Sequence, residues 1–323
     1  MMKFSLELLP NEPINDTLEL IKMAENVGFE NVWITDHYNN RDVFEVLALA
    51  AINTSIIKMG AGVSNPYVRN PVSIAAATST LDEISEGRAL VGVGPGDKAT
   101  METLNLSWKK PVKTVKEAIL SIRTLLNDEK LEQGAFLNGT KKIEGKIPIY
   151  MAAQGPKMLE TSGEVADGTL INASNPKDFE IAIPLIKKGL KKSKLSANEF
   201  NFAAYTACSV DKDVTVAQNQ SKGVVAFILA GAPDVVLERH NIDKDVALSI
   251  KKSLSEYDFK TASSLVDENM IDAFSVCGTP SQIQEKIEVL EELGVNEFVV
   301  GSPIGKDRQK SLKLLEDIIN SFN

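Results

Sequence analysis

The stretch Arg88-Ala-Leu-Val-Gly-Val-Gly-Pro-Gly-Asp97 bears on both the fold and the position of a ligand site. Its apolar part, Ala89 to Val93, has the composition of a buried strand, and the glycine-rich part ends on a single carboxylate. Glycines let a flat ligand approach the main chain closely, because no side chain intervenes. A tight strand-to-helix turn would need the same glycines only for their dihedral angles, and this stretch alone slightly favours that second interpretation.

The pattern of an apolar strand followed by an amphipathic helix repeats along the whole chain. The predicted strands cover residues 3–9, 31–34, 56–62, 89–93, 148–153, 169–171, 201–210 and 297–300. Near-continuous apolar runs are typical of parallel strands that are covered on both faces. Strand-helix units in unbroken alternation predict one α/β domain over residues 1–323, a (β/α)8 TIM barrel. An open doubly wound sheet rarely contains so many units.

Two segments are longer than a simple connection between neighbouring strands. The polar segment from Asn127 to Lys146, after the fourth helix, is predicted to form an inserted loop or a small hairpin. Residues 213–266, after the seventh strand, are predicted to be largely helical and to fold over the mouth of the barrel. Either segment could also contribute to contacts between subunits.

Composition and charge limit the partners that the chain can have. Hydrophobic residues make up 43% and charged residues 24%, as in ordinary globular proteins, and the net charge of −9 argues against nucleic-acid binding. The two cysteines, Cys208 and Cys277, give neither a disulfide framework nor a metal-ligand spacing. The sequence shows no signal-peptide pattern and no apolar run long enough for a membrane helix, so a cytoplasmic protein is predicted.

The C-terminal ends of the strands are where barrels of this kind place their ligands. There the chain delivers three carboxylates, Glu7, Asp36 and Asp97, and one histidine, His37. Strand alternation turns Glu7 toward the barrel interior, and burial of a bare charge is costly, so this carboxyl is paired, neutral or functional. Asp36 and Asp97 could instead cap the helices that follow them, and His37 could be structural.

Several chemistries are excluded by missing motifs. Two histidines in all, with no paired-cysteine motif, argue against a metal site. The chain has no phosphate-binding loop of the GxxxxGK type and no serine nucleophile elbow. Gly92-Val-Gly-Pro-Gly96 matches a dinucleotide fingerprint only in part, since it contains a proline and lacks the final glycine. A glycine-lined mouth remains, suited to a flat organic cofactor, with carboxylates available for proton transfer.

Eight stretches, taken in chain order, carry a resemblance to a known family. They are residues 33–41, 60–66, 92–98, 149–157, 170–174, 224–227, 237–240 and 301–305. Each is weak alone, but together and on successive units they are specific, and they span essentially the whole chain. They resemble the luciferase-like barrel superfamily and, within it, the deazaflavin-dependent methylenetetrahydromethanopterin reductases of methanogenic archaea.

The resemblance implies an oxidoreductase that uses coenzyme F420, an 8-hydroxy-5-deazaflavin. The implied reaction is hydride transfer to 5,10-methylenetetrahydromethanopterin, giving the methyl-pterin, in methanogenesis from CO2. The resemblance also implies a homodimer or homotetramer, and a non-proline cis peptide at Gly62-Val63 against the deazaflavin ring. The implied ring contacts are Asp36, Gly62, Val63, Ser64, Asn65 and Gly94, and the implied contacts of the phosphate-bearing tail are Ala152, Ala153, Gln154, Gly155 and Asn172.

For such a reaction the leaving nitrogen of the pterin must be protonated before the hydride arrives. Desolvation raises the pKa of a carboxylic acid inside a barrel, which suits a general acid near neutral pH. Glu7 is therefore predicted to be the acid and to contact the substrate. Asp97 is predicted to assist catalysis, either by orienting the pterin or by holding the proton network. Phe227, which could instead be a core residue, is predicted to form part of the wall over the pterin.

Three alternatives stay open at this point. The chain could be an FMN monooxygenase of the same superfamily, or an F420-dependent alcohol or sugar-phosphate dehydrogenase. Those dehydrogenases use a histidine at the end of the second strand as the base, and His37 occupies that place. A flavin-binding protein without turnover is the third alternative, although the set of Glu7, Asp36 and Asp97 weighs against it.

Overall fold

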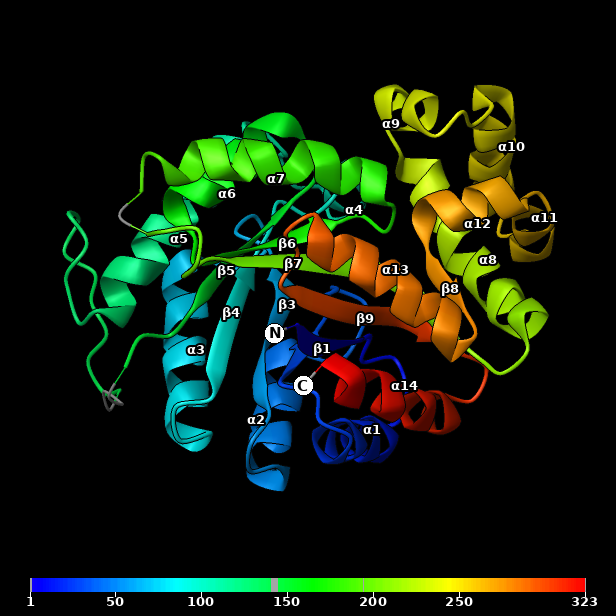
Figure 1. Ribbon diagram of the computed structural model, residues 1–323. Helices are drawn as coiled ribbons and strands as arrows, with labels where there is room; N and C mark the ends of the chain where they lie inside the picture. The colour runs from blue at the N-terminus through cyan, green and yellow to red at the C-terminus, as the bar shows by residue number, and fades with distance from the viewer. Residues whose placement is uncertain (1, 141–144, 194, 323) are drawn as a thin grey trace.

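The computed structural model describes residues 2–140, 145–193 and 195–322 and shows parallel strands closed into a ring, with helices around it (Figure 1). Each strand pairs with its neighbour in the order β6-β5-β4-β3-β2-β1-β9-β7, and the pairing of β6 with β7 closes the ring. The ring strands are β1 (Lys3–Leu8), β2 (Asn31–Ile34), β3 (Lys58–Ser64), β4 (Ala89–Val93), β5 (Ile149–Ala153), β6 (Gly168–Asn172), β7 (Asn201–Val210) and β9 (Glu297–Ile304). The predicted eight-stranded barrel is confirmed.

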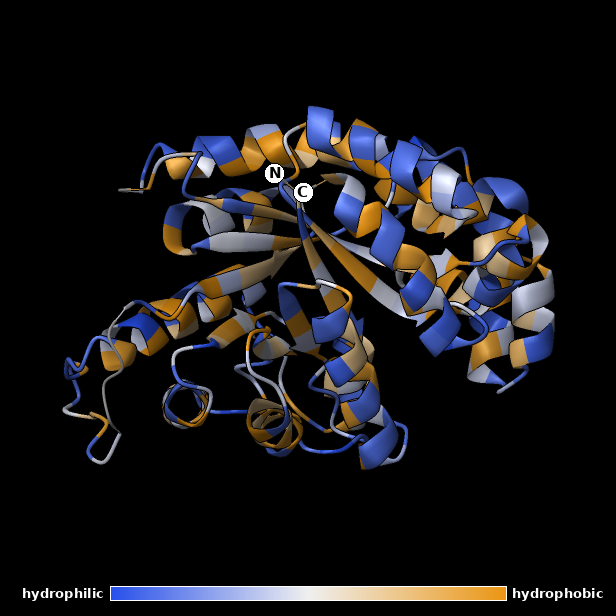
Figure 2. Cartoon of the chain, turned by 60° about the horizontal axis from the view of Figure 1, so that its bottom comes forward, coloured by the Kyte–Doolittle hydropathy of each residue, from blue (hydrophilic) through white to orange (hydrophobic). Residues whose placement is uncertain are grey.

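The helices of the outer layer follow the strands along the chain, with two of them after β4. They are α1 (Ile14–Asn26), α2 (Val43–Asn53), α3 (Pro71–Ile84), α4 (Lys98–Thr103), α5 (Pro111–Leu126), α6 (Pro156–Val165), α7 (Pro176–Leu190), α13 (Pro280–Glu292) and α14 (Arg308–Phe322). Local signals place their ends: at α3 the side chain of Asn70 accepts a hydrogen bond from Val72 N, and Pro71 occupies the first turn. These helices carry hydrophobic and hydrophilic residues on different sides (Figure 2).

The segment after β7 forms a helical insertion of five helices at the mouth of the barrel (Figure 1). They are α8 (Val214–Gly231), α9 (Asp234–Arg239), α10 (Lys244–Ser255), α11 (Phe259–Ser264) and α12 (Glu268–Phe274). The insertion has an apolar core of its own, separate from the main core. The predicted helical character of this segment is confirmed.

One strand was not predicted. β8 (Val276–Gly278) pairs in parallel with the end of β7, outside the ring, so the strand predicted at residues 297–300 is the ninth in the chain. The polar segment 127–146 lies partly outside the described residues. Its described part shows no strand, and residues 131–135 form a turn in which Leu131 N donates to Ala135 O at 2.9 Å.

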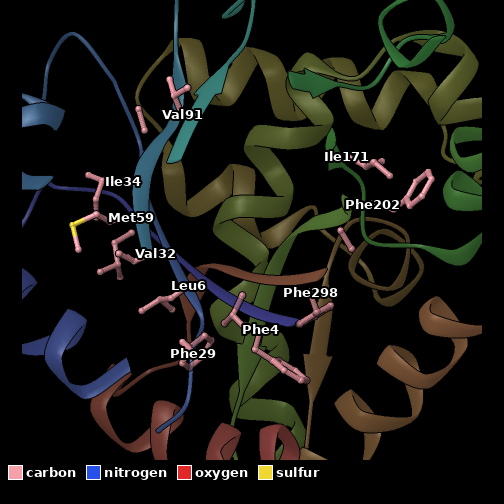
Figure 3. Packing of buried hydrophobic residues seen from close by; sticks show 14 of the residues in the cluster. Phe4, Leu6, Phe29, Val32, Ile34, Met59, Val91, Ile171, Phe202 and Phe298 are labelled. Carbon is pink, nitrogen blue, oxygen red and sulfur yellow. The ribbon is translucent and has the colours of Figure 1, made fainter. Parts of the chain in front are cut away.

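The main core lies between the strands and the surrounding helices (Figure 3). Phe4, Leu6 and Leu8 of β1 are buried there, and the ring of Phe4 packs edge-on against Phe298 of β9 with centroids 6.3 Å apart. The alternate residues of β1, Ser5 and Glu7, therefore face the barrel interior, as predicted. No helix within the described ranges combines the length and apolarity needed to cross a membrane.

A fully buried carboxylate, Glu297, organises the lower end of the barrel interior. It accepts hydrogen bonds from Ser5 Oγ at 2.6 Å, Asn31 Nδ2 at 3.0 Å, Trp33 Nε1 at 3.3 Å and Tyr150 Oη at 2.9 Å. Burial and then the nearby charge of Glu297 hold the pKa of the Tyr150 hydroxyl well above its usual value. Side chains from four strands, with the indole of Trp33 among them, are thus joined at this point of the interior.

Replacement of Glu297 should destabilise the barrel strongly. Glu297→Ala is expected to lower the free energy of unfolding by at least about 3 kcal/mol, because each buried donor left without an acceptor costs about 1–3 kcal/mol. Urea denaturation measures the change, and Glu291→Ala, on the exposed side of α13, is the matched control. Equal stability of the two variants would contradict the structural role of Glu297.

Candidate active site

Two cavities open at the C-terminal ends of the ring strands. The first, about 310 Å³, is called the bulge cavity and is lined among others by Asp36, Gly62, Val63, Asn65 and Asp97. The second, about 340 Å³, is called the insertion cavity because residues of α8, α9 and α12 close it. Its lining includes Gln154, Gly155, Asn172, Ile228 and Arg239. Predicted site residues thus fall into two groups, as expected for the two ends of an extended ligand.

The bulge itself is an interruption in the pairing of β3 with β4. The register shifts between Ala61 and Ser64, and the peptide bond between Gly62 and Val63 is cis, which confirms the expectation from the family resemblance. The hydroxyl of Tyr205, on β7, donates a hydrogen bond to Gly62 O at 2.9 Å. A Cβ on Gly62 would lie 2.8 Å from Trp33 Cβ, so the main chain lies directly against the indole side chain.

The glycines of the stretch quoted first make room for Val63. A Cβ on Gly92 would lie 2.8 Å from Val63 Cγ1, and a Cβ on Gly94 would collide with Val63 Cγ2. The valine side chain therefore lies in a notch that exists only because both residues lack side chains. The sequence suggested that these glycines face a flat ligand; the structure gives them this packing role, and ligand contact by Gly94 stays a prediction.

Asp36 is held on the wall of the bulge cavity by two neighbours. Its Oδ2 accepts hydrogen bonds from Ser64 Oγ and from Arg69 Nε, both at 2.8 Å. Arg69 also binds Asp42 at 2.6 Å, and Asp42, not Asp36, caps α2 by accepting from Phe44 N. Arg69 Nη2 also donates to Asp36 Oδ1 at 3.2 Å, so the carboxylate is held in a fixed orientation, and its contact with a ligand stays a prediction. His37 lies beside it, exposed, on the same cavity.

Glu7 lies deeper, level with Trp33 in the pairing of β1 with β2, and is not among the residues that line either cavity. Its side chain is buried, with 6% of the residue exposed, and Ser302 N donates to its Oε2 at 2.7 Å. Desolvation raises the pKa of the Glu7 carboxyl above its usual value, against the opposing effects of Ser302 and Arg308. No lysine or arginine of the described residues forms an ion pair with Glu7, so this carboxyl is a buried acid.

Asp97 occupies the position predicted for it on the cavity wall, but its carboxylate is engaged locally. It caps α4, with Oδ1 accepting from Thr100 N at 2.8 Å and Oδ2 from Thr100 Oγ1 at 2.6 Å. The capping alternative is therefore realised. No hydrogen bond joins Asp97 to Glu7 in the part of the chain that the structure describes, and a part for Asp97 in substrate binding stays a prediction.

The remaining candidates are placed as follows. Ser64 is fully buried behind the bulge. Ala152 lies beside Gly94, and a Cβ atom added to Gly94 would contact the Cβ atom of Ala152. Ala153 is buried in the main core. Phe227 is not in a core: 57% of it is exposed, and its ring lies 6.1 Å from that of Phe259.

Sequence reasoning missed three residues of this site. Tyr205 had a signal, since the alternation along β7 turns it inward with Ala203. Ser302 lies near the C-terminal end of a predicted strand, but no role was predicted for it. Arg69 had no local signal, because its two carboxylate partners lie 27 and 33 positions away along the chain.

Comparison with known proteins places this architecture in a family. The model of the luciferase-like monooxygenases matches residues 2–297, which defines the class. A 5,10-methylenetetrahydromethanopterin reductase of Methanolobus tindarius is 47% identical over 320 residues, with 97% of this chain and 98% of the relative covered. The corresponding reductase of Methanopyrus kandleri is 46% identical over 344 residues, with 99% of each chain covered.

Solved structures agree. The coenzyme F420-dependent tetrahydromethanopterin reductase of Methanopyrus kandleri superposes with a TM-score of 0.91 at 44% identity, covering 99% of both chains. An F420-dependent secondary alcohol dehydrogenase, at 20% identity and a TM-score of 0.80, shares the fold. The chain belongs to the luciferase-like family and, within it, to the family of the methylenetetrahydromethanopterin reductases.

The glycine notch can be tested by stability. Gly94→Ala is expected to lower the free energy of unfolding by about 1–3 kcal/mol, the usual cost of overpacking, because its methyl group meets Val63. The double variant Gly94→Ala/Val63→Ala should be more stable than Gly94→Ala alone, since the smaller residue vacates the notch. Gly223→Ala, where a Cβ meets nothing within 4 Å, is the control. A double variant that is no more stable would show that Val63 does not fill the notch.

Proposed function

We propose that the chain is an oxidoreductase that transfers a hydride from reduced coenzyme F420 to 5,10-methylenetetrahydromethanopterin, giving 5-methyltetrahydromethanopterin in methanogenesis from CO2. The observation that carries the proposal is a buried acid, Glu7, beside the bulge, in a chain 47% identical to one such reductase over nearly its whole length. Tyr205 connects the acid with the bulge. Its hydroxyl donates a hydrogen bond to Gly62 O, and its pKa is raised by burial and, as the second cause, by the charge of Glu7.

The bulge cavity fits a flat ring with a polar edge. Its volume of about 310 Å³ lies within the range of small-molecule sites, and main chain forms the wall at Gly62 and Val63. The hydroxyl of Thr35 lines the cavity region, is buried, and has no partner among the described residues, so the site holds a spare hydrogen-bonding group. These features suit a deazaflavin.

The proposed coenzyme contacts fall at both cavities. The ring would be held by Asp36, Gly62, Val63 and Asn65, which line the bulge cavity, with Ser64 and Gly94 behind them. The tail would be held by Gln154, Gly155 and Asn172, which line the insertion cavity, with Ala152 and Ala153 on the strand before them. When bound, coenzyme F420 supplies the hydride. The two exposed aromatic rings of Phe227 and Phe259 lie side by side on the insertion, where Phe227 would cover part of the pterin.

Glu7 would deliver the proton. Burial raises the pKa of its carboxyl above the usual value and so favours the protonated form, because the charged form loses its hydration in the barrel interior. The O–H bond of Glu7 breaks as an N–H bond forms at the leaving nitrogen of the pterin, and the methylene bridge opens. Asp97, fixed on the wall of the bulge cavity by Thr100, would orient the pterin for this step.

Glu7→Gln should separate catalysis from coenzyme binding. An amide cannot donate this proton, so kcat is expected to fall by about 100-fold or more, the usual contribution of a general acid. Affinity for coenzyme F420, measured by fluorescence titration, should change by less than about twofold, since Glu7 does not line the bulge cavity.

His37→Ala is the comparison variant, because it lies on the same cavity and would be the base in an alcohol dehydrogenase. Anaerobic absorption spectroscopy of coenzyme reoxidation with the methylene-pterin gives both rates. Near-normal turnover of Glu7→Gln together with loss of activity in His37→Ala would favour the dehydrogenase alternative and reject the present assignment.

The chain is further proposed to act in the cytoplasm as a homodimer or homotetramer. Adjacent helices α2 and α3 and the loop after α2 turn apolar side chains outward: Leu49 is 38%, Ile52 69%, Ile56 79% and Ile84 38% exposed. Contiguous exposed apolar residues mark interaction surfaces, and a second copy of this chain would cover them. This face differs from the two segments that the sequence suggested as interfaces.

The proposed subunit face can be tested by charge insertion. Ile52→Lys is expected to lower the molar mass measured by light scattering, because a lysine would be desolvated in the contact. Leu248→Lys, at an equally exposed position on α10 of the helical insertion, should leave the assembly intact. The reverse outcome would move the interface to the insertion.

A further inference from the structure

The hydrogen-bond donor that holds Glu7 comes from a specific place on β9. The pairing of β1 with β9 runs in register to Leu6 and Val300 and then stops. Two residues later, Ser302 N points at the carboxyl and donates to Oε2 at 2.7 Å. The Ser302 side chain also favours the charged form of Glu7 and so lowers its pKa. One residue thus acts on this carboxyl group through its main-chain N–H and its side chain.

The preceding residue, Gly301, leaves the space in which Oε2 lies. A Cβ at this position would be 3.0 Å from Glu7 Oε2 and would collide with the carbonyl oxygen of Thr206. No other residue type fits there without moving the acid or the neighbouring strand. The C-terminal end of β9 as a whole therefore fixes the position of the Glu7 carboxyl group.

Other titratable or charged groups that face Glu7 come from β7 and α14. The Tyr205 hydroxyl on β7 is neutral, because burial and the charge of Glu7 raise its pKa well above the usual value. Arg308, the first residue of α14, favours the charged form of Glu7 from a distance, and its own guanidinium forms an ion pair with Glu12 at 3.0 Å. Ser302 is thus the direct partner of the acid among these groups.

We propose that Ser302 is a positioning residue for the proton transfer: it holds Oε2 of Glu7 as the hydrogen-bond acceptor, so that Oε1 carries and delivers the proton. This inference rests on the proposed function. In a neutral carboxyl group the carbonyl oxygen is the better acceptor, which leaves the hydroxyl on the other oxygen. As the proton leaves Oε1 for the pterin nitrogen, negative charge develops on the carboxylate. The preorganised hydrogen bond from Ser302 N then becomes charge-assisted and stronger.

Ser302 also affects the strength of the acid. Burial raises the pKa of Glu7, and the main-chain N–H and the side chain of Ser302 oppose this rise by stabilising the carboxylate. Removal of the hydroxyl should therefore raise the pKa of Glu7 further. A purely structural serine would leave the ionisation of Glu7 unchanged, so titration distinguishes the two roles.

The test is an infrared titration of the carboxyl band of Glu7 in the full-length protein without ligands, with Glu7→Gln used to assign the band. In Ser302→Ala the band is expected to persist to higher pH than in the native protein. Ser302→Thr, which keeps the hydroxyl, should restore the native titration. With coenzyme and pterin, Ser302→Ala should lose about tenfold in kcat, the equivalent of one hydrogen bond, with KM for the coenzyme within about twofold.

An unchanged titration in Ser302→Ala, or one moved to lower pH, would overturn the inference. A titration moved equally in Ser302→Ala and Ser302→Thr would overturn it as well, because the hydroxyl would then not be the cause. The infrared measurement needs no turnover. Its outcome is therefore distinguishable from a failure of the proposed reaction, which would appear as an absence of coenzyme oxidation by the native protein.

Discussion

The burial of one carboxyl group without a cationic partner is the constraint on which the rest of the site depends. A bare carboxylate inside a barrel is costly, so the surrounding chain either keeps Glu7 protonated or supplies donors to it. Both effects act here: burial raises the pKa of Glu7, and Ser302 N donates a hydrogen bond to one of its oxygens. The acid is then able to release a proton and to remain in place afterwards, which is what the proposed reaction requires.

A second buried carboxylate, Glu297, shows what a structural role looks like in the same barrel. Its oxygens accept from four side chains on β1, β2 and β5, and nothing is left for a ligand. The chain thus separates stability at the lower end of the interior from chemistry at the mouth, as barrels of this kind do. Trp33 links the two, since its indole donates to Glu297 and its Cβ lies against Gly62 of the bulge.

Much of the fold could be predicted because it follows from local periodicity. Apolar runs are properties of neighbouring residues, and the ring strands followed from them. β8 could not be predicted, because three residues show no period. The cis peptide at Gly62-Val63 came from the family resemblance alone, since nothing in the residue types indicates it.

The site was predictable only in part, for physical reasons. Residue type and strand alternation were enough to turn Glu7 inward, but the cap at Asp97 depends on Thr100, and a cap and a ligand contact look alike in sequence. Gly92 and Gly94 were associated with ligand approach, whereas they make room for the side chain of Val63 from another strand. Arg69 and Ser302 act across long separations in the chain, and such contacts have no local signature.

Isotope transfer tests the central claim most directly, namely that the chain passes a hydride from the coenzyme to the pterin. The measurement uses reduced coenzyme F420 labelled with deuterium at C5, and mass spectrometry of the methyl-pterin formed in ordinary water. The account predicts one deuterium in the new methyl group, and none when unlabelled coenzyme reacts in heavy water. A methyl group that takes its hydrogen from the solvent would contradict it.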